Sequence, residues 1–131
     1  MNRSKAEDAI KAAGLTAERV TIEQMEAEIE SEHYFTAADG AIHAQLSSGL
    51  ASNIPPPLRL MTFCVLVLKN GFTVTGKSAC ASPDNFNAEI GRQIARENAI
   101  ESMWPLFGFR LRDKISERSR ETYNDIVGGG S

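Results

Sequence analysis

The sequence is poor in the residues that metal sites and catalytic centres use. Its 131 residues include two cysteines and two histidines, with no CxxC pair, so the ligand spacing of a zinc site is missing. A GxSxG elbow, a phosphate-binding GxxxxGK loop, a GxGxxG turn and an HExxH helix are missing as well. We therefore expect no bound metal, no cofactor and no catalytic activity.

Long apolar runs and an excess of positive charge are also absent. The longest apolar stretch, within Leu60–Leu68, is too short to cross a bilayer, and no signal peptide or lipidation motif is visible. The net charge of −3 argues against general nucleic-acid binding, which needs a positive surface to displace counterions. We expect a protein of the cytoplasm that contacts neither membranes nor nucleic acids in general.

The composition that remains predicts one globular domain. Hydrophobic residues make up 42% of the chain and charged residues 24%, both within the usual range, and the length suits a single core. We assign residues 1–127 to one α+β domain, in which residues 1–20 are expected to be mobile and residues 47–57 to form a proline-rich loop. The final four residues, 128–131, look like a linker or tag remnant.

Charge is unevenly distributed along this domain. Residues 1–40 hold nine acidic and four basic side chains, whereas residues 89–121 hold seven basic and six acidic ones. A site for a negatively charged molecule is therefore expected toward the C-terminus. A solvated helix surface of mixed charge explains the same residues without any ligand.

The N-terminal region predicts two helices. Ser4–Ala13 places small and apolar residues on one side and stops at Gly14. Thr21 and Gln24 have the spacing of a capping box, at the start of a second helix with a single apolar stripe formed by Ile22, Met25 and Ile29.

Between the second helix and the next clear signal, little regular structure is expected. Asp39-Gly40 ends the helical region, and a weak strand is predicted near Ile42–Leu46. Ser47–Pro57 is read as a long loop, because its consecutive prolines favour an extended, helix-free chain.

A β-hairpin is the strongest local prediction. Leu58–Leu68 and Phe72–Ala81 are rich in β-branched and aromatic residues, and Asn70-Gly71 between them supplies the positive φ angles of a two-residue type I′ turn. This turn pairs Lys69 with Phe72. It predicts a core face that holds Met61, Phe63, Val65, Val67, Phe72, Val74 and Cys80.

The opposite face of the hairpin is half apolar, with Leu60, Cys64, Leu66 and Leu68 beside Thr73, Thr75 and Lys77. A strand that is apolar on both sides needs a cover on both sides, so another element or a second subunit is expected there. The same register points Cys64 and Cys80 to opposite faces, where no disulfide geometry is available. Both are expected to be free thiols.

A long helix should follow the hairpin. Ser82 and Pro83 suit its N-cap and first position, and Pro105 disfavours helix in the residue before it, so the helix is expected to end near Trp104. Its apolar side changes midway, from Ile90, Gly91, Ile94 and Ala95 to Ala99, Ile100, Met103 and Trp104. A helix of this kind contacts two partners, which we expect to be the hairpin and a second chain. After Gly108, Arg112–Tyr123 is predicted to be a polar helical tail.

Residues suited to nucleotide binding cluster in and after this helix. An aromatic ring stacks on a base and arginines bind phosphates, so the candidate ligand-binding residues are Asn85, Phe86, Arg92, Arg96, Asn98, Arg110, Arg112 and Asp113. Two simpler explanations stay open. Phe86 could be a core staple while the arginines pair with Glu89 and Glu97 at helical spacing, and Asn98 could fix packing register instead of reaching into a pocket.

A family resemblance rests on residues 61–109, MTFCVLVLKNGFTVTGKSACASPDNFNAEIGRQIARENAIESMWPLFGF, and on the earlier HYFTAADG. Hairpin, NGF, SAC, P-x-N-F and W-P-L-x-G occur in this order. The chain resembles, over roughly residues 20–112, the small phage and prophage proteins of the "gp forty-nine" family. The hairpin–helix pattern is also similar, more weakly, to the anti-Thoeris sponge proteins, with which phages capture cyclic ADP-ribose signals of bacterial immunity.

The second resemblance implies a function. It implies an α+β protomer that assembles into dimers or hexamers and sequesters a cyclic nucleotide without catalysis, and some such proteins also hold the cyclic oligonucleotides that CBASS defence uses. In matching regions the candidate ligand-binding residues are Asn85, Phe86, Arg92, Arg96, Arg112 and Asp113. We therefore expect a homo-oligomeric counter-defence protein in the cytoplasm of the infected host. The alternatives are an interaction module that docks on a host or phage protein, and a small enzyme acting on nucleotides.

Overall fold

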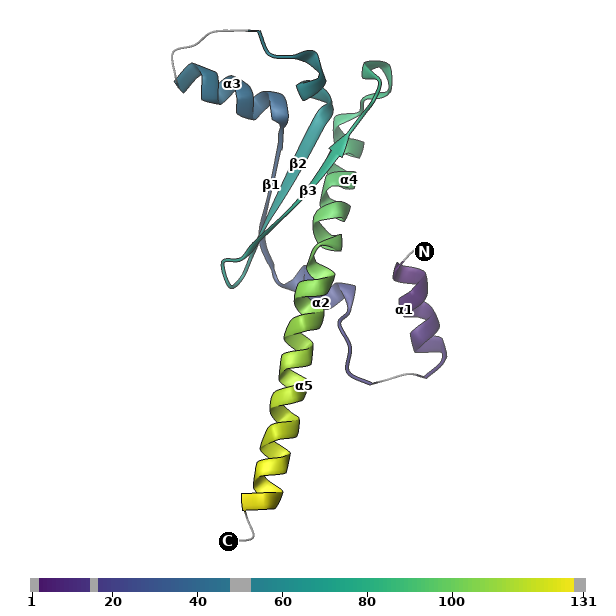
Figure 1. Ribbon diagram of the computed structural model, residues 1–131. Helices are drawn as coiled ribbons and strands as arrows, with labels where there is room; N and C mark the ends of the chain where they lie inside the picture. The colour runs from purple at the N-terminus through teal and green to yellow at the C-terminus, as the bar shows by residue number, and fades with distance from the viewer. Residues whose placement is uncertain (1–2, 15–16, 48–52, 129–131) are drawn as a thin grey trace. The chain divides into compact units, whose positions relative to one another are not determined.

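The computed structural model describes residues 3–14, 17–47 and 53–128 (Figure 1). It forms two compact units. The helical unit comprises Met1–Glu26 and Trp104–Ser131, and the sheet unit comprises Ala27–Met103. The sheet unit holds a three-stranded antiparallel sheet and the helical unit holds the N-terminal and C-terminal helices, so the predicted α+β class is confirmed.

The N-terminal part of the helical unit follows its sequence signals. Helix α1 spans Arg3–Ala12 and is followed by Gly14 at a φ of 71°, a left-handed conformation that glycine adopts without strain. Helix α2 spans Ile22–Ala27, and its capping box is confirmed: Gln24 donates its N–H to Thr21 Oγ1 over 3.2 Å, and Thr21 donates to Gln24 Oε1 over 3.1 Å.

The C-terminal helix corrects the predicted role of Pro105. The helix after the hairpin, α4, ends at Glu101, and a separate helix, α5, runs over Met103–Gly128 and includes both Pro105 and Gly108. Proline is tolerated in the first turn of a helix, where its missing N–H would have no partner in any case. Pro105 therefore marks the start of a helix, not the end of one. Residues 129–131, the rest of the predicted linker, lie outside the described residues.

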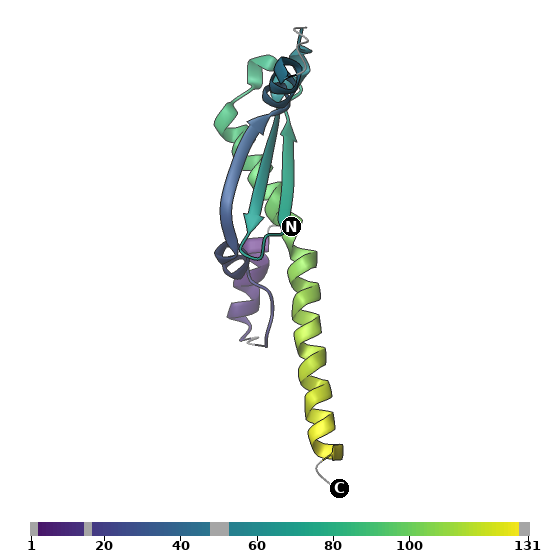
Figure 2. The same cartoon turned by 90° about the vertical axis from the view of Figure 1, so that its left-hand side faces the viewer.

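The sheet unit contains a strand that the sequence reading missed. Strand β1 spans Ile29–Thr36, pairs with β2, Met61–Leu68, and β2 pairs with β3, Thr73–Ala79, in the order β1-β2-β3 (Figure 2). The stripe that was assigned to one helix therefore ends with α2, and Ile29 already belongs to a strand.

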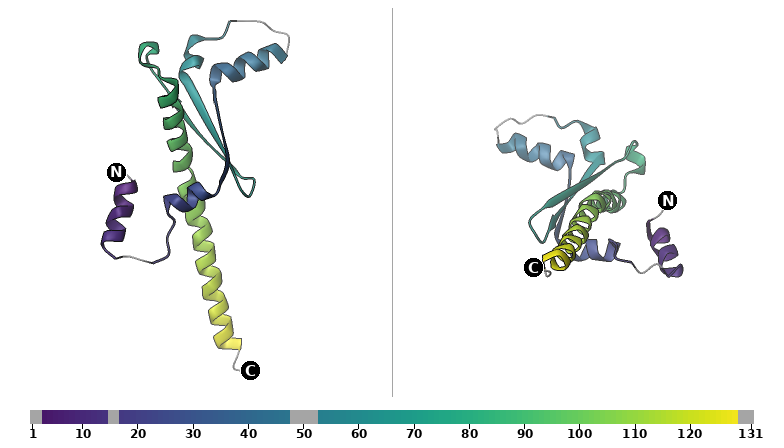
Figure 3. Two further views of the ribbon diagram at one scale, coloured as in Figure 1. Left: turned by 180° about the vertical axis from the view of Figure 1, so that it is seen from behind. Right: turned by 60° about the horizontal axis from the view of Figure 1, so that its bottom comes forward.

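The segment between β1 and β2 is also more helical than predicted. Helix α3 spans Ala37–Ser47, so the expected weak strand at Ile42–Leu46 is wrong. The prolines lead into a short 3-10 helix, η1, at Pro56–Leu60, where they occupy the first positions and no donor is lost. Residues 48–52 of the predicted loop lie outside the described residues. Helix α3 and η1 contact each other at one end of the sheet (Figure 3).

The hairpin is present with a different turn. Leu68 N–H donates to Phe72 O over 2.8 Å and Gly71 N–H donates to Leu68 O over 2.9 Å, so three residues form the loop. Only Gly71 has a positive φ, 87°, whereas a type I′ turn would require one at Asn70 as well. The register therefore shifts by one residue, and Leu66 pairs with Val74.

A shift of one residue moves every side chain of β3 to the other face relative to β2. The predicted core face is consequently wrong. Thr62, Cys64, Leu66 and Leu68 are buried together with Val74, whereas Met61, Phe63, Val65 and Val67 are half-buried and Phe72 is 52% exposed. We call the first the covered face and the second the open face.

The two cysteines are free thiols, as predicted, but they do not lie on opposite faces of the sheet. Cys80 continues the ladder opposite Leu60, through its N–H to Leu60 O, and has the same parity as the covered face that holds Cys64. What separates the thiols is four positions along the sheet, or about 13 Å.

Helix α4, Ala88–Glu101, lies against β2 and β3 on the covered face (Figures 1 and 3). Its contact side is a stripe of small residues, Gly91, Ala95 and Ala99. A Cβ added to Gly76 would lie 2.1 Å from the Ala95 carbonyl oxygen and 2.2 Å from the Ala99 nitrogen. Strand and helix backbones therefore touch at Gly76, while Ile90 and Ile94 remain 54% and 43% exposed.

The start of α4 differs from the prediction too. Ser82 precedes a separate 3-10 turn, η2, at Pro83–Asn85, and Asn87 is the N-cap of α4. The Asn87 side chain accepts from the N–H groups of Glu89 and Ile90, over 3.0 and 3.1 Å. Phe86 lies in the extended link between these two elements.

Candidate functional site

A hollow of about 100 Å³ lies in the sheet unit, where β1 ends and where α3 and α4 begin. Side chains from three stretches of the chain line it: Tyr34, Phe35, Thr36, Asp39, Thr62, Phe86, Ala88 and Arg92. The hollow thus combines three aromatic rings, two hydroxyl-bearing threonines, one carboxylate and one guanidinium.

Two helix caps set the shape of this hollow. Thr36 N–H donates to Asp39 Oδ2 over 2.9 Å, and Asp39 N–H donates to Thr36 Oγ1 over 3.1 Å, which is a capping box at the start of α3. On the other side, the Asn87 cap fixes the start of α4 between Phe86 and Ala88. Both helices therefore begin at the hollow, where their dipoles favour negative charge.

Phe86 is half-buried and forms part of the wall, so it is not a staple sealed within the core. Phe35, on β1, is 41% exposed and stacks on Phe63 with ring centroids 5.6 Å apart. Phe35 therefore belongs both to the hollow and to the edge of the open face.

The two arginines of α4 differ in their partners. Arg96 forms an ion pair with Glu32 of β1, whose carboxylate also accepts from the Tyr34 hydroxyl over 3.4 Å. Arg92 lies one helical turn earlier and forms no ion pair with any described residue, so the expected pairing with Glu89 is not seen. Arg92 is thus the cation of the hollow that is available to an anion.

Tyr34 and Cys64 form a neutral polar wall beside this ion pair. Burial, reinforced by the nearby Cys64 and Glu32, raises the pKa of the Tyr34 hydroxyl from 10.0 to about 12. Burial also raises the pKa of the Cys64 thiol. Both groups are protonated at neutral pH.

The structure brings together two of the predicted ligand-binding residues, Phe86 and Arg92. Asn85 is exposed in η2 and does not line the hollow. Asn98 lies toward the other side of α4, where its amide donates to the Lys77 carbonyl over 2.8 Å. This bond supports the alternative in which Asn98 fixes the packing of the helix.

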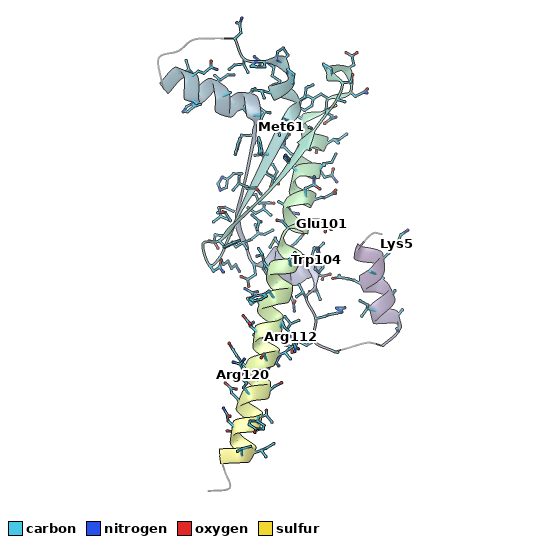
Figure 4. The ribbon with its side chains drawn as sticks, in the orientation of Figure 1. Lys5, Met61, Glu101, Trp104, Arg112 and Arg120 are labelled. Atoms are coloured by element: carbon cyan, nitrogen blue, oxygen red, sulfur yellow. The ribbon has the colours of Figure 1, made fainter. Side chains whose placement is uncertain are left out.

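Three further predicted residues lie on α5 in the helical unit. The guanidinium of Arg110 stands 4.4 Å above the centre of the Phe107 ring. Arg112 and Asp113 are exposed, and Figure 4 labels Arg112 on the same helix as Arg120.

Sequence reasoning missed the residues that β1 and α3 contribute, notably Tyr34 and Asp39. A usable signal was present, because Thr36 and Asp39 have capping-box spacing within the HYFTAADG stretch. Asp39-Gly40 alone suggests the end of a helix, whereas Thr36 and Asp39 together cap the beginning of α3.

Comparison with known proteins assigns the chain to a family but does not identify a ligand. Among the residues that the structure describes, no group of three potential metal ligands occurs, and no helix combines the length and apolarity that a membrane crossing requires. Neither a curated protein nor a solved structure matches the chain. One family model matches residues 20–115, which include the complete sheet unit and the hollow. On this match the chain belongs to the phage protein (N4 Gp49/phage Sf6 gene 66) family.

Proposed function

We propose that this phage-family protein is a counter-defence protein that binds and sequesters a cyclic nucleotide immune signal, of the cyclic ADP-ribose type or a cyclic oligonucleotide, without cleaving it. The observation that carries the proposal is the shared hollow of Phe86 and Arg92, an aromatic ring beside a guanidinium with no ion-pair partner among the described residues. Family membership supports a phage origin, and with it action in the cytoplasm of the infected host.

The chemistry of the hollow suits a nucleotide. A base stacks on the Phe86 ring, a phosphate is bound by the Arg92 guanidinium, and two helix N-termini add favourable potential for the same negative charge. Sequestration needs no chemical step. Binding lowers the concentration of free signal, so less of it reaches its receptor. This requires that the protein is more abundant than the signal and that its Kd lies below the signalling concentration.

The hollow is too small to enclose such a ligand alone. Pockets for ligands of this size usually measure roughly 300–1,000 Å³, whereas this one measures about 100 Å³. In this proposal the hollow holds one part of the ligand, and a second copy of the chain supplies further walls in a homo-oligomer. Arg96, one helical turn after Arg92 on α4, remains a candidate contact for the rest of the ligand.

Calorimetry tests the proposal directly. The wild-type protein is titrated with cyclic ADP-ribose isomers and with cyclic di- and trinucleotides, and the ligand is then recovered by denaturation and analysed by mass spectrometry. Micromolar or tighter binding of at least one ligand, recovered unchanged, is expected. Absence of binding at micromolar concentrations overturns the proposal, and recovery of a cleaved product favours the small enzyme.

Two variants locate the binding. Arg92→Gln and Phe86→Ala should each weaken the affinity for the tightest-binding ligand by about tenfold or more. Arg92→Gln removes a charge-assisted hydrogen bond, and Phe86→Ala removes a stacking surface. Arg120→Gln is the matched control, because Arg120 is an exposed arginine outside the hollow. Equal losses in Arg92→Gln and Arg120→Gln would mean that binding is a general charge effect.

A second function is favoured by a different observation. The open face presents four half-buried apolar side chains of β2, namely Met61, Phe63, Val65 and Val67, and adjoins the exposed Phe35 ring. Such a surface suits docking on a host or phage protein. A pull-down from infected cells that yields a stoichiometric protein partner and no retained nucleotide would favour this interaction module over the sponge.

A further inference from the structure

Opposite charges line the hollow without neutralising each other. Asp39 and Arg92 both contribute to its wall, yet neither forms an ion pair with any residue in the described part of the chain. Carboxylate and guanidinium groups that are free to move usually pair when they share a small space. Here Asp39 belongs to α3 and Arg92 to α4, and the two side chains line the hollow without forming an ion pair.

The orientation of Asp39 is fixed by its structural role. Its Oδ2 accepts the Thr36 N–H over 2.9 Å, and its own N–H donates to Thr36 Oγ1. The second carboxylate oxygen makes no hydrogen bond with a described residue. A carboxylate accepts up to about four hydrogen bonds, so Asp39 keeps most of its accepting capacity for a molecule in the hollow.

We propose that Asp39 is the specificity-determining residue of the hollow, and that it selects ligands in which hydrogen-bond donors stand beside an anionic group. Ribose hydroxyls next to a phosphate meet this description: the phosphate binds Arg92 and the hydroxyls donate to Asp39. Inorganic phosphate is disfavoured, because it lacks the ribose hydroxyls and its negative charge is repelled by the carboxylate. The inference rests on the proposed function and names the part of the ligand that this site recognises.

Asp39→Asn separates the two roles of the side chain. The amide oxygen of asparagine can accept the Thr36 N–H and keep the cap, so its NH2 group then faces the hollow. The variant thereby replaces an acceptor with a donor and removes the negative charge. Binding of cyclic ADP-ribose and of AMP should weaken by about tenfold or more, whereas inorganic phosphate should bind a few-fold more tightly.

Calorimetry measures the nucleotides, and amide chemical-shift titration measures inorganic phosphate. A second comparison uses AMP and 2′,3′-dideoxy-AMP: the wild type should prefer AMP, and Asp39→Asn should lose this preference. Asp39→Glu, which keeps a carboxylate and suits a capping box, should retain it. Asp84→Asn is the matched control, since Asp84 is exposed in η2 outside the hollow.

The outcomes separate the two proposals. Opposite changes for nucleotide and phosphate in Asp39→Asn, with none in Asp84→Asn, support the inference. Unchanged nucleotide binding in a folded Asp39→Asn overturns the role of Asp39 and leaves the proposed sponge intact. If Asp39→Asn loses α3, Asp39→Glu decides: equal affinity for AMP and its dideoxy analogue overturns the inference. Failure of the wild type to bind any of these nucleotides overturns both.

Discussion

The covered and open faces of the sheet both carry apolar side chains of β2 but have different surroundings. On β2 the side chains alternate between the two, and Leu66 is fully buried while its neighbour Val65 is half-buried. The difference arises outside β2. On the covered face Gly76 opposes Ala95 and Ala99, and these small residues let α4 approach the strands closely. The face on which α4 packs is therefore decided by the position of these small residues, and not by which side of β2 is more apolar.

The largest effect is expected from adding a side-chain atom to Gly76, where the strand contacts α4. Gly76→Ala places a Cβ about 2 Å from two backbone atoms of α4, which cannot move aside as a side chain can. We expect a loss of about 3 kcal/mol or more in the free energy of unfolding, measured by urea denaturation. Gly108→Ala is the control, because an added Cβ there meets nothing within 4 Å and alanine favours helix. A loss below about 1 kcal/mol for Gly76→Ala would contradict the close contact.

Neighbouring truncations on β2 compare the faces directly. Leu66→Ala should cost about 2–5 kcal/mol, because it leaves a cavity under α4. Val65→Ala should cost no more than about 1 kcal/mol, since its side chain already contacts solvent. If Val65→Ala proves as costly as Leu66→Ala, and its cost depends on protein concentration, the open face is covered by a second copy in solution.

The hairpin shows how far sequence alone could predict the fold. Asn70-Gly71 located the turn, but it fits a two-residue loop and a three-residue loop equally well. The choice depends on whether Asn70 adopts a positive φ, which the twist of the whole sheet decides. One residue of error then exchanged the faces and with them the predicted core.

Strand β1 was lost for a different reason. Ile22, Met25 and Ile29 fit one helical stripe, and the acidic sequence that follows carries no clear alternation of apolar and polar residues. Only pairing with β2 makes it a strand. Phe86 and Arg92 were predictable as candidate site residues because they belong to one local segment, whereas Tyr34 and Asp39 reach the hollow only through that pairing.

A moderate loss of stability is expected from removing the hydrogen bond that joins α4 to β3. Asn98→Ala removes the hydrogen bond to the Lys77 carbonyl and should cost about 1 kcal/mol. Amide hydrogen exchange in β3 should accelerate in this variant. Gln93→Ala, an exposed change on the same helix, should leave both quantities unaltered. An unchanged exchange rate in Asn98→Ala would show that the amide does not hold the strand.

The smallest effect at neutral pH is expected from Tyr34, beside Cys64 on the covered face. Because burial raises the pKa of Tyr34 from 10.0 to about 12, the folded protein favours the protonated phenol. The resulting stabilisation is complete below pH 10 and is lost as the pH rises toward 12. Tyr34→Phe should flatten the pH dependence of the melting temperature in this interval, and Tyr123→Phe, on an exposed side chain, should not. Identical curves for wild type and Tyr34→Phe would refute the assignment.

The bond between Asn98 and Lys77 also bears on self-association. β3 is an outermost strand of the three-stranded sheet, and such strands offer peptide groups that can recruit another chain and seed fibres. Asn98 occupies one of these groups from a helix that is itself packed on the sheet, so an incoming strand must first displace the Asn98 amide. The Asn98 amide therefore makes this edge of β3 less available to a second chain.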